Sequence, residues 1–178
     1  MGKKIYFIRH CEANGQSAEA ALTKRGFRRA KELAEHLKDE RITRIISSPY
    51  LRAIQTIEPF STVKGIEIEM DNRLIERQLS KGDLPDWMQK LEHSFVDMDL
   101  KCNGGESSNE AMKRGIEVID DISKGKDDRV AVITHGNLLT LLLKYYHDEI
   151  GFKFWKNLRN PDVWLLDFSE KGVQINQF

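Results

Sequence analysis

The chain has 178 residues, with 28 lysines and arginines, 28 aspartates and glutamates, and a formal net charge of zero. This length is typical of one domain with a full core, so we expect residues 1–178 to form a single domain. Balanced charge argues against partners that attract a basic excess, so we expect neither nucleic-acid nor membrane binding. A local cationic pocket is still compatible with zero net charge, because attraction within a cleft depends on the charges nearby.

Cysteine content and the N-terminal segment indicate the compartment. Cys11 and Cys102 are the only cysteines, so the sequence contains no disulfide framework. The apolar run at residues 5–8 is too short for a signal peptide or a membrane span. We therefore expect a cytoplasmic protein.

The first segments alternate between strand and helix patterns. Residues 5–8 are continuously apolar, which is typical of a buried strand. Thr23 can cap a helix that extends to about Asp39. The apolar positions of this helix follow helical spacing and predict its buried face: Phe27, Ala30, Leu33, Ala34 and Leu37.

A second strand and helix follow in the same order. Residues 44–47 predict a short strand that runs into Ser48-Pro49, a hydroxyl cap with proline at the first helical position. We expect Pro59 to limit the far end of this helix. Residues 66–70 alternate apolar and acidic side chains, as a half-exposed strand does.

The middle of the chain is less periodic. We expect a loop over residues 71–85 and a helix from Asp86 into the mid-nineties. Ser107 and Glu110 form a capping-box pattern for a further helix that reaches about Ser123.

The last third contains three more strand patterns. Residues 130–134 predict a fully buried strand, and Asn137 can cap the apolar helix at residues 138–146. Residues 163–168 and 173–175 predict closing strands. The alternation along the chain predicts an α/β fold, a three-layer sandwich in which helices cover both faces of a mixed, mainly parallel sheet.

Parallel strands bring their carboxyl ends to one edge, where ligands bind in open α/β folds. The segments that follow the first four predicted strands carry two histidines, two arginines and a carboxylate. We therefore expect one rim to hold these five side chains: Arg9, His10, Arg52, Glu76 and His135.

These residue types suit the chemistry of a phosphomonoester. Arg9 and Arg52 offer planar forks of N–H donors for phosphate oxygens. His10 offers a ring nitrogen as nucleophile, which would form a phosphohistidine. His135, if protonated, can stabilise charge on the transferred group, and Glu76 can protonate the leaving oxygen.

Six short motifs also occur in a fixed order over residues 5–137. They are Ile8-Arg9-His10-Cys11-Glu12, the segment from Leu22 to Gly26, the segment from Ser48 to Thr56, Leu74 to Glu76, Gly104 to Ser107, and Thr134 to Gly136. In this order the chain resembles the histidine phosphatase superfamily, in its phosphoglycerate mutase-like branch.

The resemblance implies a role for each predicted site residue. His10 would be the phosphorylated nucleophile, Arg9, Arg52 and His135 would bind the phosphate, and Glu76 would be the proton donor. It also implies a phosphoglycerate mutase-like fold, a small phosphorylated substrate, and no metal or organic cofactor.

Three positions depart from the family pattern. Cys11 replaces a glycine, so its backbone either avoids positive φ or is strained, and its thiol beside the nucleophile predicts sensitivity to oxidation. Gly82-Asp83 stands where the family often has a longer motif, which makes Asp83 a rival proton donor. Asn137 follows Gly136 where some branches have an aspartate, so the acid role falls to Glu76.

Other phosphate chemistries do not fit the spacing. A cysteine phosphatase needs an arginine six positions after its cysteine, but Ser17 and Ser108 occupy those positions. No nucleotide-binding phosphate loop and no zinc motif is present. Our leading hypothesis is a metal-independent phosphatase. A phosphoglycerate mutase and an inactive module that binds a phosphorylated ligand are the alternatives, and no feature indicates the substrate or an oligomeric state.

Overall fold

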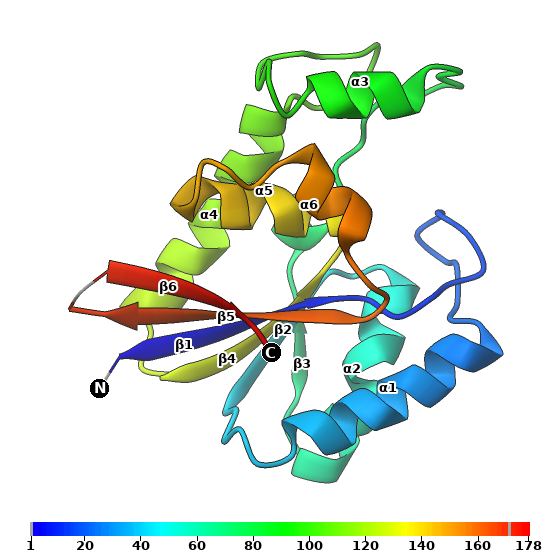
Figure 1. Cartoon of the computed structure of the whole chain (residues 1–178). Coiled ribbons are helices and arrows are strands. Elements are labelled where there is room, and N and C mark those ends of the chain that lie inside the picture. The colour runs from blue at the N-terminus through cyan, green and yellow to red at the C-terminus, as the bar shows by residue number, and fades with distance from the viewer. Residues whose placement is uncertain (1, 171) are drawn as a thin grey trace.

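The computed structural model describes residues 2–170 and 172–178, and a six-stranded sheet runs through its centre (Figure 1). The strand order is β3-β2-β4-β1-β5-β6. The four strands β1 to β4 are mutually parallel, and β5 and β6 pair antiparallel, which confirms the mixed, mainly parallel sheet. The strand bounds are Lys3–Arg9 (β1), Arg44–Ser47 (β2), Ile68–Met70 (β3), Arg129–Thr134 (β4), Asp162–Ser169 (β5) and Gly172–Gln177 (β6).

Helices cover both faces of this sheet. In Figure 1, α1 (Lys24–Leu37) and α2 (Leu51–Lys64) lie below it, while α4 (Ser108–Lys124) and α5 (Gly136–Tyr146) lie above it. The short helix α6 (Phe152–Asn157) lies beside α5, and α3 (Trp87–His93) lies farthest from the sheet. A short 3-10 turn, η1 (Asn72–Leu74), follows β3. This arrangement confirms the three-layer fold.

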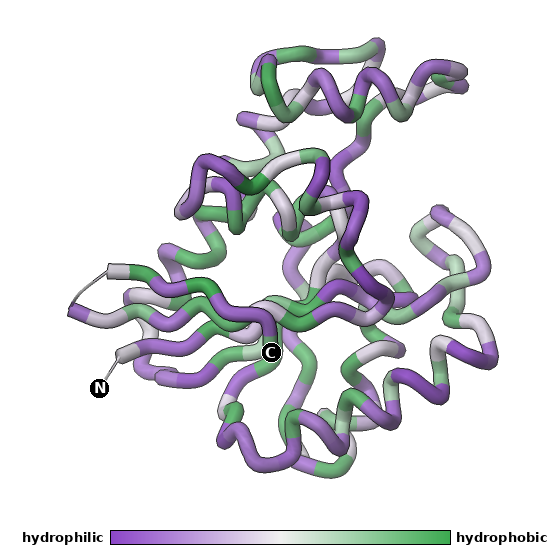
Figure 2. Tube along the Cα trace, viewed as in Figure 1, coloured by the Kyte–Doolittle hydropathy of each residue, from purple (hydrophilic) through white to green (hydrophobic). Residues whose placement is uncertain are grey.

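The position of β1 inside the sheet explains why its sequence is continuously apolar. Ile5 and Phe7 pack in the core beneath α4 and α5, whereas Tyr6 and Ile8 pack in the second core beside α1 and α2. Successive side chains of a strand point to opposite faces, and here both faces are buried. Figure 2 shows the apolar residues of the chain gathered along the sheet and on the helix sides that face it.

The register brings four loops to one edge of the sheet. Arg9 pairs with Thr134, and Ser47 pairs with both Ile133 and Met70. The chain therefore leaves β1, β2, β3 and β4 at the same level, and the predicted site residues follow these strand ends.

Helix α2 differs from the prediction at both ends. It begins at Leu51 rather than Ser48, and its N-cap Tyr50 makes no side-chain cap. Pro59 lies inside the helix, which ends at Gly65, a glycine with φ of 64°. The lost N–H of Pro59 is outweighed by burial of Ile57 and Phe60, so the proline does not end the helix.

Three smaller expectations were wrong. Phe27 is 41% exposed, because the buried seam of α1 follows Gly26, Ala30, Leu33 and Leu37, one position away from it. Strand β3 begins at Ile68, two residues later than expected. Asn137 does not cap α5, whose N-cap is His135 without a side-chain bond. Within the described part of the chain, none of the helices combines the length and apolarity that crossing a membrane requires.

Candidate active site

His10 leaves the end of β1 with its ring held at both nitrogens. Nδ1 lies 2.6 Å from the carbonyl oxygen of Cys11, and Nε2 lies 3.2 Å from Nε of Arg52. A carbonyl oxygen only accepts and a guanidinium only donates, so the proton resides on Nδ1 and Nε2 carries the lone pair. The contacts thus select the tautomer that a nucleophilic Nε2 needs.

The surroundings of His10 also keep the ring uncharged. Burial, followed by the positive charges of Arg52 and Arg9, lowers the pKa of His10 to about 4, against an opposing contribution from the Cys11 carbonyl. A neutral imidazole is therefore the dominant form at neutral pH. This is the form that can attack an electrophile.

The lowered pKa of His10 predicts a loss of stability in acid. The unfolded histidine has a pKa of about 6.5, so it binds a proton before the folded one as the pH falls. Stability is present in full above pH 6.5 and is lost as the pH falls towards 4, by about 2 kcal/mol between pH 7 and pH 5 for this group. Urea unfolding of wild type and His10→Gln at both pH values measures it. If both proteins lose the same free energy of unfolding between pH 7 and pH 5, the buried neutral ring of His10 is contradicted.

Arg9 lies against the first residue of α5. A Cβ atom at Gly136 would lie 3.0 Å from Nε and 3.1 Å from Cζ of Arg9, so glycine is what allows this approach. Arg9 Nη1 donates to the carbonyl oxygen of Leu158 at 2.9 Å. Burial lowers the pKa of Arg9 while Glu76 and Asp162 oppose that shift, and a guanidinium remains charged at any physiological pH.

Arg52 is 1% exposed and contacts both His10 and the loop after β1. Besides its bond to His10, Arg52 donates from Nη1 to the carbonyl oxygens of Gln16 and Ser17 at 3.2 and 2.7 Å. Its Cζ lies 4.9 Å from the centre of the Tyr50 ring, a cation–π distance. Arg52 therefore anchors the loop and places a positive charge beside the nucleophilic nitrogen.

His135 completes the group from the end of β4. Its ring centre lies 5.1 Å from that of His10 and 5.0 Å from that of Tyr50, and its Nε2 lies 2.8 Å from Ser48 Oγ. Burial, followed by electrostatic repulsion between the protonated forms of His135 and His10 and by the charge of Arg52, lowers the pKa of His135 well below its usual value. The protonated form of His135, which was the condition for charge stabilisation by this ring, is therefore disfavoured in this geometry. A neutral ring still donates one N–H.

Glu76 lies at the N-terminus of α5. Its Oε1 accepts the backbone N–H of Arg77 and Leu138 at 2.9 and 3.0 Å, and its Oε2 accepts that of Asn137 at 3.1 Å. Glu76 thus provides the helix cap that we expected from Asn137, because its carboxylate satisfies two free N–H groups of the first turn. A carboxylate has about four acceptor positions, so one on Oε2 is left for a proton or a substrate oxygen.

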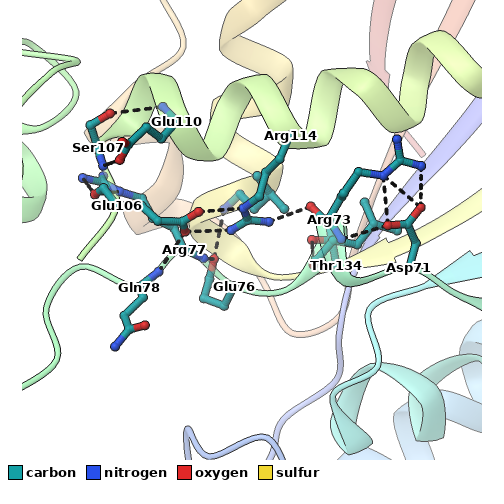
Figure 3. A network of polar contacts seen from close by, with 12 residues as sticks. Asp71, Arg73, Glu76, Arg77, Gln78, Glu106, Ser107, Glu110, Arg114 and Thr134 are labelled. Carbon is teal, nitrogen blue, oxygen red and sulfur yellow. Dashed lines mark hydrogen bonds and ion pairs between the residues drawn. The ribbon is translucent and has the colours of Figure 1, made fainter. Parts of the chain in front are cut away.

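The segment that carries Glu76 is clamped to α4 by a polar network (Figure 3). Arg114 binds Glu106 through two bonds of 2.8 and 2.9 Å and donates to the carbonyl oxygen of Arg73 at 2.6 Å. Arg73 in turn pairs with Asp71 at 2.7 Å. Burial alone would raise the pKa of Glu106, but Arg114 holds it below its ordinary value. The network fixes residues 71–76 between β3 and α4.

Arg77 is a buried guanidinium that the sequence did not single out. It makes four hydrogen bonds, two to the carbonyl oxygen of Glu106 and one each to Ser94 Oγ and Ser108 Oγ. Burial lowers the pKa of Arg77, against the opposing charges of Glu106 and other groups. Its bonds join α3, α4 and the Glu76 segment, so its role is structural.

The site opens into a cavity of about 470 Å³ between the sheet edge, α3 and α6. Its lining includes His10, Glu76, Trp87, Leu91, Asn137 and Trp155. A second cavity of about 1020 Å³ shares the walls Gln16, Glu76, Arg77, Leu79 and Trp87 and adds Arg52. The first volume is within the range of small-molecule sites, and the second is at its upper end.

Unpartnered polar atoms concentrate at the same edge. Of the four buried side-chain nitrogen and oxygen atoms without a hydrogen bond in the described residues, three belong to Arg9 (Nε), His135 (Nδ1) and Asn137 (Oδ1). Such atoms are rare in folded proteins and often mark a functional site. Among residues 2–170 and 172–178, no cluster of three histidine, cysteine or acidic side chains is placed to hold a metal ion.

Comparison with known proteins identifies the family of this chain. The sequence profile of the histidine phosphatase superfamily (branch 1) matches residues 5–178. The chain belongs to the histidine phosphatase superfamily. A relative from Shigella dysenteriae serotype 1, named "Probable phosphoglycerate mutase GpmB", is 28% identical over 194 aligned residues, which cover 94% of this chain and 86% of the relative.

Solved structures share the fold. YhfR of Bacillus stearothermophilus superposes with a TM-score of 0.80 at 21% identity and covers 98% of this chain and 96% of its own. A mycobacterial glucosyl-3-phosphoglycerate phosphatase gives a TM-score of 0.79 at 19% identity and covers 99% and 97%. Both confirm the phosphoglycerate mutase-like architecture of this histidine phosphatase superfamily member.

The cysteine that replaces the family glycine causes no backbone strain. Among the described non-glycine residues only Arg41 has a positive φ, and the Cys11 N–H donates to Thr56 Oγ1 at 2.9 Å. The Cys11 side chain is fully buried, and burial raises the pKa of its thiol to about 11. Both observations argue against the expected sensitivity to oxidation, because the thiolate is disfavoured and covered.

The structure also places the rival carboxylate. Asp83 is exposed on the wall of the larger cavity and does not line the smaller one that contains His10. Glu76 lines both. Sequence reasoning missed the contact of Ser48 with His135 and the presence of Trp87 and Trp155 in the cleft. Ser48 lies in a family motif, but no local signal marks the two tryptophans.

Proposed function

We propose that this protein is a metal-independent phosphatase that hydrolyses small phosphomonoesters through a covalent phosphohistidine on His10. One observation carries the proposal: the Nε2 lone pair of a neutral His10 lies beside Arg52, with the His135 ring centre 5.1 Å from that of His10. The superfamily includes phosphatases and mutases, so the reaction and the substrate are the parts that we propose.

The first step is attack by His10 on phosphorus. Arg9 and Arg52 bind the phosphate oxygens and offset their charge. The Nε2–P bond forms as the bond from phosphorus to the ester oxygen breaks, and Glu76 gives its proton to that oxygen. The Cys11 carbonyl, 2.6 Å from Nδ1, stabilises the positive charge that the ring acquires.

The second step regenerates the enzyme. Water attacks the phosphohistidine, the P–N bond breaks, and the ionised Glu76 accepts the proton of the water. The products are inorganic phosphate and neutral His10. Glu76 has one acceptor position that its three backbone bonds do not use, which supports both transfers.

The charges around the cleft favour a phosphatase over a phosphoglycerate mutase. A mutase must bind the carboxylate of its substrate in addition to the phosphate, which calls for a further cation. Beyond Arg9 and Arg52, Arg77 is the one cationic side chain among the described lining residues of either cavity, and it is tied to Glu106, Ser94 and Ser108. The bacterial relatives named as mutases make mutase activity the second candidate.

The proposed substrate is a small phosphorylated molecule in the cytoplasm. The two free cysteines support this location. The balanced charge argues against nucleic-acid or membrane partners.

Phosphate release from 4-nitrophenyl phosphate tests the proposed function. We expect turnover that dialysis against a chelator leaves unchanged within about twofold, because no step needs a metal. On 3-phosphoglycerate we expect no conversion to 2-phosphoglycerate. Phosphate binding without any turnover would favour the inactive binding module, and efficient conversion to 2-phosphoglycerate with little hydrolysis would favour the mutase.

A further inference from the structure

Two tryptophans form the part of the cleft that lies beyond the phosphate site. Trp87 begins α3 and Trp155 lies in α6, and both line the cavity that contains His10. Leu79 and Leu91 line the same cavity. One occupant of this cavity can therefore contact the nucleophile and both indole rings.

The two indoles meet at a right angle. Their ring centres lie 6.3 Å apart, with an interplanar angle of 85°. Phe152 stacks on Trp155 at 5.5 Å and 23°, so one side of Trp155 is held by its own helix. Trp87 is 46% exposed. A flat ring that stacks on one indole is perpendicular to the other, and both arrangements are favourable between aromatic rings.

The charges of this region select against a second anionic group. The acidic lining residues of the smaller cavity are Glu12 and Glu76, and the larger one adds Asp83 and Glu106. The remaining cation, Arg77, is already bound to oxygen atoms of the protein. A carboxylate or a second phosphate on the leaving group would lie among like charges without a free partner.

We propose that the leaving group of the substrate is an uncharged alcohol that carries a flat aromatic ring, bound against Trp87 and Trp155 while its phosphate lies at His10. This inference names the substrate class of the proposed phosphatase and rests on that function. The tryptophans bind the ring and set specificity, and the bond that breaks is the same phosphate ester bond.

Three esters of matched chemistry test the inference: 3-phenylpropyl, 3-cyclohexylpropyl and n-propyl phosphate. Their alcohols have nearly equal acidity, so differences in kcat/KM report binding of the end group. We expect the phenyl ester to react best. Trp87→Leu and Trp155→Leu should each lower kcat/KM for the phenyl ester roughly three- to tenfold and leave that for n-propyl phosphate within about twofold. Phe27→Ala, an exposed aromatic on α1, is the control and should change neither.

The outcomes separate this inference from the proposed function. If all three esters are hydrolysed equally well, or the cyclohexyl ester best, the aromatic assignment is wrong and the phosphatase stands. If no ester is hydrolysed, the proposed phosphatase function is wrong. The aromatic site is then tested separately, by calorimetric binding of 3-phenylpropylphosphonate and n-propylphosphonate. The aromatic site is supported if 3-phenylpropylphosphonate binds more tightly than n-propylphosphonate and if Trp87→Leu weakens its binding. Equal binding of the two phosphonates overturns it.

Discussion

Replacing His10 with alanine is expected to lower kcat for any phosphomonoester by at least about 10⁴-fold, because it removes the atom that forms the covalent bond. His10→Gln should lower kcat by as much, since an amide keeps the polarity of the side chain but has no nucleophilic nitrogen. Steady-state phosphate release measures both. The loss should be independent of the leaving group, since no ester can use the covalent route.

The matched control for this experiment is His93→Ala, because His93 is exposed in the last turn of α3. We expect that variant to keep wild-type activity within about twofold. Thermal unfolding confirms that the His10 variants are folded. A folded His10→Ala protein that retains a tenth or so of wild-type turnover would exclude the phosphohistidine route.

Glu76→Gln is expected to give the second-largest effect, and one that depends on the leaving group. General acid catalysis contributes about 10²- to 10⁴-fold, so n-propyl phosphate hydrolysis should fall by that factor. The rate of phosphoenzyme formation from 4-nitrophenyl phosphate should change far less, because 4-nitrophenolate leaves without a proton. Rapid-quench kinetics with both esters measure the difference.

Glu76 also caps α5, so the variant needs a structural control. Glutamine keeps one oxygen for Arg77 and Leu138 but turns an amide N–H₂ towards the Asn137 N–H, which should cost about 1 kcal/mol of stability. Asp83→Asn makes the same chemical change on the wall of the larger cavity and should leave activity within about twofold of wild type. If both esters lose activity equally, Glu76 acts only as a positioning residue. If Asp83→Asn shows the leaving-group dependence instead, Asp83 is the acid.

The strands and their convergence could be predicted because local pattern and topology agree. The apolar runs of β1 and β4 are buried on both faces, and parallel strands must end at one edge. His10 and His135 follow those two strands directly, so their proximity follows from the sheet. Arg52 is less direct: it is brought in by the first turn of α2 and held there by two loop carbonyls.

The errors arose where long-range contacts override local signals. Asn137 has the residue type of a cap, but the carboxylate of Glu76 reaches the first turn of α5 from a loop 61 residues earlier. Pro59 has the residue type of a helix end, but α2 continues past it and buries Ile57 before it and Phe60 after it. Neither the Glu76 cap nor the burial around Pro59 can be read from the neighbouring sequence.

The Gly104–Ser107 motif shows how a family signature can be structural. A Cβ atom at Gly105 would lie 2.1 Å from the carbonyl oxygen of Leu79, so the chain passes too close for any other residue. Glu106 then reaches Arg114, which fixes the segment that carries Glu76. The aromatic cleft had no such signature, because α3 and α6 are distant in sequence and meet only in the folded chain.

Trapping the covalent intermediate tests the central claim most directly. The enzyme is mixed with an ester that carries a radiolabelled phosphate, quenched in alkali within one turnover, and digested to peptides. We predict a label on the peptide that contains His10, stable in alkali and lost in acid, which forms and decays fast enough to account for kcat. Continued turnover with no label on His10, or a label confined to another residue, would contradict the account.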